Sequence, residues 1–93
     1  MYNRPRIEYD PFKNRLNREK HGIAFSELET VFVDERAITI EDTGHAEQRW
    51  LTLGSDAAGR VLVVAYTWRG QMIRIISARR ASCAERRRYE EQP

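Results

Sequence analysis

The sequence VLVVAYTWRGQMIRIISARR, residues 61–80, sets the architecture of the chain. Its first six residues are apolar without alternation, a pattern typical of a central strand covered on both faces. Arg69-Gly70 fits a two-residue hairpin turn, and Met72–Arg79 then returns as an antiparallel strand. Side chains alternate between the two faces of a strand. The stretch therefore predicts a central hairpin that carries one arginine on each face of the sheet, Arg74 and Arg79.

Two further strands and two helices are predicted upstream of this hairpin. The strands cover residues 37–41 and 48–53, where apolar and polar residues alternate. The first helix, residues 11–21, begins after Asp10-Pro11 and ends at Gly22. The second, residues 26–33, has Ser26 and Glu29 in the positions of a capping box.

The two ends of the chain add one element each. A short strand is predicted at Arg6–Asp10, and a last helix near 83–91 follows a second capping box, Ser82 with Glu85. The element order predicts an α+β fold: a twisted antiparallel β-sheet meander with two N-terminal helices on one face and a C-terminal helix. We expect residues 1–93 to form a single domain, with the second face of the sheet free for function.

Composition excludes several classes of protein. Mean hydropathy is −0.70 and no apolar run approaches 18 residues, so no membrane span is expected. The N-terminus lacks the apolar stretch of a signal peptide, and the single cysteine, Cys83, suits a reducing cytoplasm. His21, His45 and Cys83 lie too far apart for a typical zinc motif, and no glycine-rich phosphate loop is present. We therefore expect a cytoplasmic protein without a metal or other cofactor.

The charges are strongly segregated along a chain whose net charge is only +2. Residues 26–48 carry one arginine and seven acidic residues, whereas residues 49–88 carry nine arginines against Asp56 and Glu85. Fourteen of the sixteen basic residues are arginine. Guanidinium is planar and binds two phosphate oxygens at once, so this bias favours phosphate recognition. Codon usage in a GC-rich genome is the alternative explanation of the bias.

Arginines from several elements are predicted to converge near one end of the sheet. Such a cluster binds phosphate groups; the alternative for those of the last helix is a solvated surface with local salt bridges. Arg74 and Arg79 interrupt an apolar strand, where an unpaired charge is costly. Each therefore needs a carboxylate partner or a ligand. The cluster comprises Arg49, Arg74, Arg79, Arg80, Arg86 and Arg87.

Residues 7–91 resemble the BrnT toxins of bacterial type II toxin-antitoxin systems, in the order and spacing of Lys20-His21-Gly22, Arg49-Trp50, RIISAR at 74–79, and Glu85-Arg86 with Tyr89. The resemblance implies a RelE-like fold and a ribonuclease activity that arrests growth by reducing translation. It also implies neutralisation by a BrnA-like antitoxin with a DNA-binding module, through which alone the toxin would reach operator DNA. Gln48 stands where many members have a second glutamate.

RNA cleavage without a metal uses the 2′-hydroxyl as nucleophile, so the protein supplies a base, an acid and charge stabilisation of the phosphorane. We assign Arg49 and Arg79 to the transition-state phosphate. The proton-transfer candidates are Glu47, His21 and Tyr89. Further phosphate contacts are expected from Arg74, Arg80, Arg86, Arg87 and Lys20.

Each proton-transfer candidate also has a structural alternative. His21 fits the C-terminal end of a helix, where its charge favours the last carbonyls. Glu47 can simply pair with Arg49, and the Tyr89 ring can pack on the sheet. Trp50 and Trp68 are expected in the core or against a partner rather than stacked on bases.

Two other functions remain open from the sequence. One is a nucleic-acid-binding module without catalysis, and the other is a toxin on the same fold that acts on a protein such as DNA gyrase. RNA cleavage that persists in EDTA would distinguish the ribonuclease from both.

Overall fold

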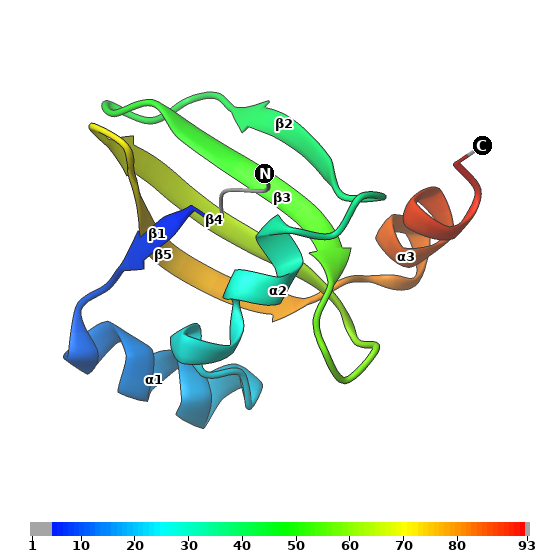
Figure 1. Cartoon of the computed structure of the whole chain (residues 1–93), viewed down its shortest axis with the longest axis horizontal. Coiled ribbons are helices and arrows are strands. Elements are labelled where there is room, and N and C mark those ends of the chain that lie inside the picture. The colour runs from blue at the N-terminus through cyan, green and yellow to red at the C-terminus, as the bar shows by residue number, and fades with distance from the viewer. Residues whose placement is uncertain (1–4, 93) are drawn as a thin grey trace.

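Five strands form one mixed sheet in a computed structural model that describes residues 5–92 (Figure 1). Their order across the sheet is β1-β5-β4-β3-β2. The four-strand antiparallel meander agrees with the prediction. The bounds are β1 (Arg6–Glu8), β2 (Ile38–Asp42), β3 (Arg49–Ser55), β4 (Val61–Arg69) and β5 (Met72–Arg80).

The first strand makes the sheet mixed rather than purely antiparallel, which corrects the prediction. β1 pairs parallel to β5, with Ile7 opposite Ile73 and Glu8 opposite Arg74. Parallel neighbours need a long crossover between them, and here nearly the whole chain separates the two strands. The pairing therefore leaves no local signal in the sequence.

The first helix, α1 (Pro11–His21), has the predicted bounds because both of its ends are determined locally. The Asp10 side chain accepts a hydrogen bond from the Phe12 N–H at 2.9 Å. Gly22 ends the helix in the left-handed region, with a φ of 70° that suits glycine.

The predicted second helix is instead a 3-10 turn, η1 (Phe25–Glu27), followed by a single turn of α-helix, α2 (Glu29–Phe32). The N-cap residues Ala24 and Leu28 provide no side-chain cap, so the predicted capping box of Ser26 and Glu29 is wrong. The first N–H of η1, from Phe25, donates instead to the Asn14 side chain at 2.8 Å. The buried residues Phe25, Leu28 and Val31 recur every third position. This spacing fits the three residues per turn of a 3-10 helix better than a continuous α-helix.

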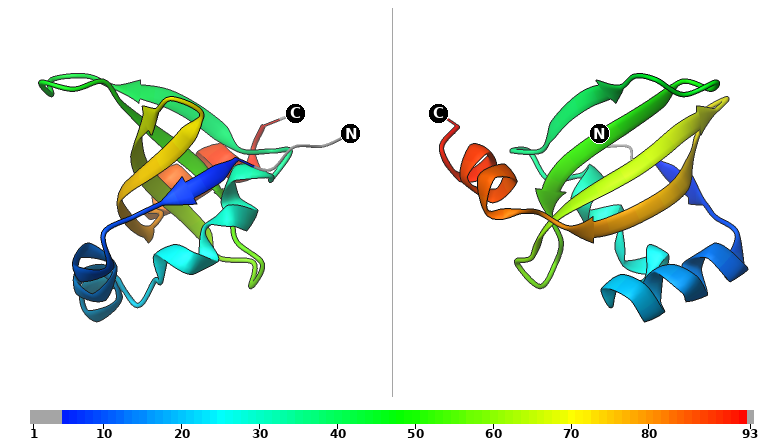
Figure 2. Two further views of the ribbon diagram at one scale, coloured as in Figure 1. Left: turned by 60° about the vertical axis from the view of Figure 1, so that its left-hand side comes forward. Right: turned by 180° about the vertical axis from the view of Figure 1, so that it is seen from behind.

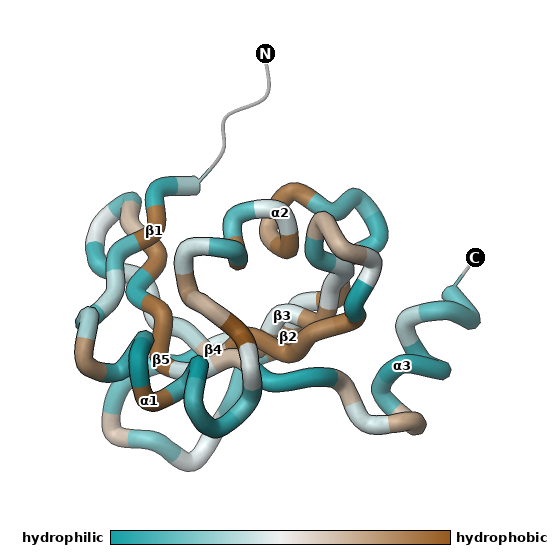
Figure 3. Tube along the Cα trace, turned by 90° about the horizontal axis from the view of Figure 1, so that it is seen from below, coloured by the Kyte–Doolittle hydropathy of each residue, from teal (hydrophilic) through white to brown (hydrophobic). Residues whose placement is uncertain are grey.

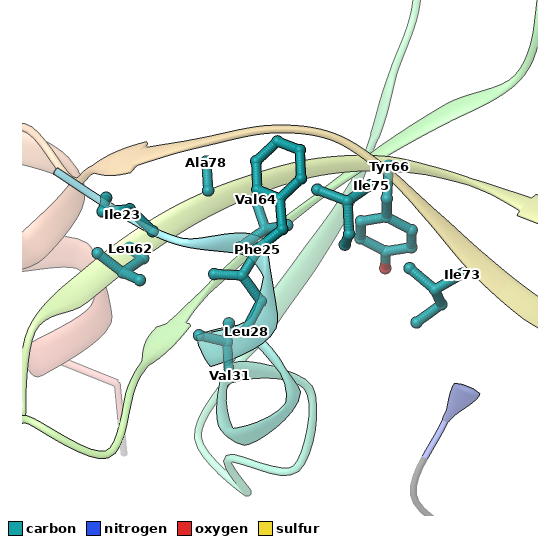
Figure 4. Close-up of a cluster of buried hydrophobic side chains, with 10 residues drawn as sticks. All are labelled: Ile23, Phe25, Leu28, Val31, Leu62, Val64, Tyr66, Ile73, Ile75 and Ala78. Carbon is teal, nitrogen blue, oxygen red and sulfur yellow. The ribbon is translucent and has the colours of Figure 1, made fainter. Parts of the chain in front are cut away.

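The hydrophobic core lies between one face of the sheet, here called the covered face, and the segment that follows α1 (Figure 4). Ile23, Phe25, Leu28 and Val31 pack against the central strands. Polar groups that reach the core are paired: the Thr52 hydroxyl bonds to Tyr66 at 2.8 Å and to Thr39 at 2.9 Å. The strand side of the core comprises Leu62, Val64, Tyr66, Ile73, Ile75 and Ala78.

A β-bulge in β5 corrects the predicted alternation of its side chains. Tyr66 lies opposite Ile75 while Ala65 lies opposite Ser77, so Ile76 has no partner on β4. The extra residue returns Ala78 to the core, and Arg74 and Arg79 consequently share the face opposite the core. The hairpin turn is also displaced by one residue, because β4 extends through Arg69.

Asn17 of α1 completes the edge of β5 beyond the short strand β1. Its amide oxygen accepts from the Ala78 N–H at 3.1 Å, and its amide nitrogen donates to the carbonyls of Ala78 and Ile23 at 2.9 and 3.0 Å. One buried side chain thus makes the hydrogen bonds that a neighbouring strand would make.

The C-terminal helix, α3 (Cys83–Glu90), lies at one end of the sheet and is almost entirely hydrophilic (Figures 1 and 3). The predicted capping box of Ser82 and Glu85 is confirmed. None of its residues is buried, and polar contacts attach it: the Tyr89 hydroxyl donates to Asp34 at 2.5 Å, and Arg36 donates to the Gln92 carbonyl at 3.0 Å. Within residues 5–92, no helix is long and apolar enough to cross a membrane.

Candidate active site

The second face of the sheet, here called the open face, is not covered by α1, η1 or α2 (Figure 2). A row of polar side chains crosses it at the end where β5 begins. Strand register places Thr67 opposite Arg74, and Arg49 next to Thr67, whose hydroxyl donates to the Gln48 carbonyl at 2.7 Å. The complete row, here called the arginine row, is Asp42, Arg49, Thr67, Arg74 and Glu8.

The two arginines of the row have carboxylate partners that leave most of their donors free. Arg49 Nε lies 3.3 Å from Glu47, and Arg74 Nη1 lies 3.9 Å from Glu8. Glu8 is shared with Arg69, also at 3.9 Å. The side chains of Arg49 and Arg74 are 30% and 29% exposed, so each is partly desolvated yet accessible from solvent.

The spacing of these arginines suits a single phosphate group. Their strands are separated by one strand, which puts the backbones about 10 Å apart. Two arginine side chains can span that gap from both sides and meet above Thr67. Paired guanidinium groups are the donors that best match phosphate oxygens, so the row can bind one phosphodiester and stabilise negative charge on it.

His45 adds a proton-transfer group that the sequence analysis considered only as a metal ligand. It lies in the loop before β3, and its Nε2 is 3.1 Å from the Asp42 carboxylate. Asp42 is the strand partner of Arg49, and Glu47 lies in the same loop. A signal was present in the sequence: a carboxylate three residues before a histidine, close to an arginine that begins a strand.

Arg79 is on the open face but not in the arginine row. It lies opposite Val63, four residues along β4 from Thr67, or about 13 Å. Its guanidinium binds both oxygens of Glu85, at 2.7 and 2.9 Å. Those bonds, and those from Ser82, lower the pKa of Glu85 to about 2. Arg79 therefore has an internal carboxylate partner, one of the two outcomes the sequence predicted.

The other predicted site residues do not join the arginine row. Arg80 is opposite Leu62, on the covered face, and Lys20 and His21 end α1. Tyr89 donates its proton to Asp34, and burial together with this bond raises its pKa to about 12. Arg86 and Arg87 are exposed on α3, where Arg86 pairs with Glu90 at 3.5 Å. The predicted convergence of all these arginines is therefore wrong, because Arg79 and Arg80 lie near the other end of β5 from Arg74 and point to opposite faces of the sheet.

No three His, Cys, Asp or Glu side chains among residues 5–92 gather in a way that could hold a metal ion.

Comparison with known proteins identifies a protein family and a similar solved structure. Residues 9–85 match the family model described as ribonuclease toxin, BrnT, of type II toxin-antitoxin system. Among solved structures, the crystal structure of the Brucella abortus ribonuclease toxin BrnT superposes with a TM-score of 0.67 at 25% sequence identity, covering 84% of this chain and 97% of that chain. No curated protein sequence matches. The matched segment includes Arg49, Thr67 and Arg74, and ends before Arg86.

Proposed function

The chain belongs to the BrnT family of ribonuclease toxins of type II toxin-antitoxin systems, and from this we propose that it cleaves RNA on the open face, above Thr67 and between Arg49 and Arg74. The observation that carries the proposal is the position of two partly desolvated arginines in one row of one face. Among the described residues, the covered face has no comparable pair of arginines, because the hydrophobic core occupies it.

The proposed reaction needs no metal ion. The 2′-hydroxyl of one nucleotide loses its proton and attacks the adjacent phosphorus, the bond from phosphorus to the 5′-oxygen breaks, and the products are a 2′,3′-cyclic phosphate and a 5′-hydroxyl. Arg49 and Arg74 bind the non-bridging oxygens, on which negative charge grows in the transition state. A charge-stabilising pair that is fixed in advance stabilises this state more than the substrate.

Glu47 and His45 divide the proton transfers in this proposal. The Glu47 carboxylate, 3.3 Å from Arg49 Nε, is able to accept the proton of the 2′-hydroxyl. A histidine hydrogen-bonded to a carboxylate is held in one orientation, so His45, with its Nε2 3.1 Å from Asp42, is placed to give a proton to the leaving 5′-oxygen. His21 and Tyr89 receive no catalytic role, since Tyr89 already donates its proton to Asp34.

The remaining arginines act on the substrate at longer range. Arg79 binds a flanking phosphate of the same RNA strand when Glu85 releases it, because a phosphate and a carboxylate compete for the same pair of guanidinium donors. Lys20, Arg80, Arg86 and Arg87 contribute to the electrostatic attraction of RNA rather than to the bond-breaking step.

The first test is cleavage of a purified RNA in the presence of EDTA. Arg49→Ala and Arg74→Ala are each expected to reduce the cleavage rate at least 100-fold, since each removes a charged donor to the transition state. Arg18→Ala, on the exposed surface of α1, is the control for loss of one positive charge. Unchanged cleavage by either row variant, with a circular dichroism spectrum like that of the wild type, would remove this site from the mechanism.

A chemically modified substrate separates the two proton transfers. Replacing the leaving 5′-oxygen with sulfur removes the need for a general acid. We expect His45→Ala to lose most of its activity on ordinary RNA and to recover it on the sulfur substrate, whereas Glu47→Gln loses activity on both. Equal loss on both substrates by His45→Ala would assign it another role.

We extend the proposal to the biology of the family. The protein is expected to act in the cytoplasm as one domain, residues 1–93, with a RelE-like fold, and to arrest growth by reducing translation. A BrnA-like antitoxin neutralises it and links it to operator DNA through its own DNA-binding module. Growth arrest that survives loss of RNA cleavage in Arg49→Ala would instead favour a protein target.

A further inference from the structure

An apolar cleft on the open face lies beside the arginine row and is not used by the proposed reaction. Its volume is about 60 Å³. Its floor is formed by side chains of three neighbouring strands, and two residues of α3, Glu85 and Arg88, line its other side. The apolar residues are Ile38, Ile40, Leu51, Leu53 and Val63.

The cleft reaches the free edge of the sheet. β2 is the last strand in the order, so about half of its backbone N–H and C=O groups point away from β3 and have no strand partner. Ile40, on this strand, is 43% exposed and is one of the few large apolar residues at the surface. An exposed strand edge next to an apolar strip is the arrangement to which an extended peptide adds as a further strand.

The charge at the rim of the cleft indicates the chemistry of the occupant. Among residues 5–92, the Arg88 side chain has no ion-pair or hydrogen-bond partner, whereas Arg79, Arg86 and Arg49 each have a carboxylate. Arg88 is exposed, so its guanidinium donors are free to bind a carboxylate on whatever covers the cleft. The small volume has room for part of one apolar side chain, which suits an extended segment better than a helix.

We propose that the antitoxin docks here: an extended segment of it pairs with the free edge of β2, inserts an apolar side chain into the cleft and places a carboxylate against Arg88. The inference rests on the proposed function, since a type II toxin has a protein antitoxin. Leu51 and Arg49 are two residues apart on β3, about 7 Å. A segment seated on the cleft therefore obstructs access of RNA to the arginine row, and this obstruction neutralises the toxin.

The test uses the full chain together with the protein encoded by the neighbouring open reading frame. Ile40→Asp and Arg88→Glu are each expected to weaken binding at least tenfold, the first by placing a charge in the apolar contact and the second by opposing the carboxylate. Leu16→Asp and Arg87→Glu are the matched controls, because Leu16 is 47% exposed on α1 and Arg87 does not line the cleft. Both controls should change the dissociation constant less than twofold.

Hydrogen exchange in the wild-type complex gives a measurement that does not depend on any variant. Amides of residues 38–42 should gain protection when the partner binds. No gain in protection, no binding of the wild type, or equal weakening by the control variants would overturn the inference. So would a homodimer of the free chain that Ile40→Asp dissociates, because the occupant would then be a second copy.

The two proposals fail in distinguishable ways. RNA cleavage by the free toxin tests the arginine row alone, and Ile40→Asp should cleave at the wild-type rate while resisting inhibition by the partner. If the wild type does not cleave RNA but the cleft variants still abolish partner binding, the proposed function fails and the docking surface stands.

Discussion

At the scale of single residues, the buried amide of Asn17 shows how one side chain replaces a missing stretch of strand. β1 pairs with only three residues of β5. Beyond them the backbone of Ala78, which is fully buried, would lack partners at the sheet edge. Asn17 provides one acceptor and one N–H donor there, and its amide nitrogen also donates to the Ile23 carbonyl, which fixes the turn after α1.

Asn17→Ala is expected to lower the free energy of unfolding by about 3 kcal/mol, because it leaves buried backbone groups without partners. Asn17→Asp should be at least as harmful, since a carboxylate keeps the acceptor but faces the two carbonyl oxygens. Urea denaturation measures both, with the exposed Glu19→Ala as control. A loss below 1 kcal/mol in Asn17→Ala would show that water or a backbone shift replaces the amide.

The ion pair of Glu85 with Arg79 makes the stability of the fold depend on pH. Hydrogen bonds from Arg79 lower its pKa to about 2 from an ordinary value of 4.5. A depressed pKa stabilises the fold fully above pH 4.5, and this stabilisation is lost as pH falls from 4.5 towards 2. Because Glu85 is one-third exposed, solvent screening limits the contribution to about 1 kcal/mol.

We therefore expect Glu85→Gln to be less stable than the wild type near neutral pH and to lose less stability on acidification. Thermal unfolding between pH 7 and pH 2 measures this difference. Glu90→Gln, at an exposed pair with Arg86, is the control and should follow the wild-type curve. Parallel curves for Glu85→Gln and the wild type would mean that the pair with Arg79 does not hold in solution.

At the scale of elements, the bulge in β5 decides which face each arginine occupies. With regular alternation instead of the bulge, Ala78 would lie on the face opposite to the core residues Ile73 and Ile75, and Arg79 would point into the core. A bulge is set by packing around the strand rather than by the residues within it. Ile76 fits the alternation in the sequence as well as its neighbours do, so simple periodicity misplaced Arg79.

Deletion of Ile76 is expected to leave the fold intact, because removing the extra residue restores regular alternation with Ala78 inside and Arg79 outside. The cost should be less than about 2 kcal/mol in the free energy of unfolding. Deletion of Ala65 from β4 is the matched control and should abolish folding, since it moves Leu62 and Val64 out of the core. Circular dichroism with urea denaturation distinguishes the two, and equal damage would contradict this account of the bulge.

At the scale of the whole molecule, the sequence predicted what local signals determine. The bounds of α1, the capping box of α3 and the four-strand meander follow from caps, turns and alternation close by in the chain. The pairing of β1 with β5 could not be predicted, because about 65 residues separate partners such as Glu8 and Arg74. The 3-10 turn was missed because burial of three residues overrode the capping pattern.

The candidate site was predictable in its residue types but not in its partners. An arginine inside an apolar strand needs a carboxylate or a ligand, and this argument singled out Arg74 and Arg79. Which carboxylate each one meets depends on tertiary structure: Glu8 comes from β1, far away in the sequence, and Glu85 from α3, the helix that follows β5. The pairing of His45 with Asp42 depends on the conformation of the loop between β2 and β3, which the sequence alone did not give.

Contacts between arginines and RNA phosphates release counterions, so we expect RNA binding by this protein to weaken as salt is added. We expect the logarithm of the association constant for a non-cleavable 2′-O-methyl RNA to fall linearly with the logarithm of salt concentration. Arg49→Ala and Arg74→Ala should each reduce the slope by about 0.7, the value for one phosphate contact on a single strand. Fluorescence anisotropy at several salt concentrations measures this, and an unchanged slope would exclude a phosphate contact at that position.

The parallel pairing of β1 with β5 also fixes the order in which the fold can be completed during synthesis. The ribosome synthesises β1 before the other four strands and β5 after them, and the edge of the sheet cannot close until both have emerged. Contacts between residues so distant in sequence form late, after the loop between them has been ordered. Arg74 acquires its Glu8 neighbour only then, so the arginine row is completed after all the other strands of the sheet have been made.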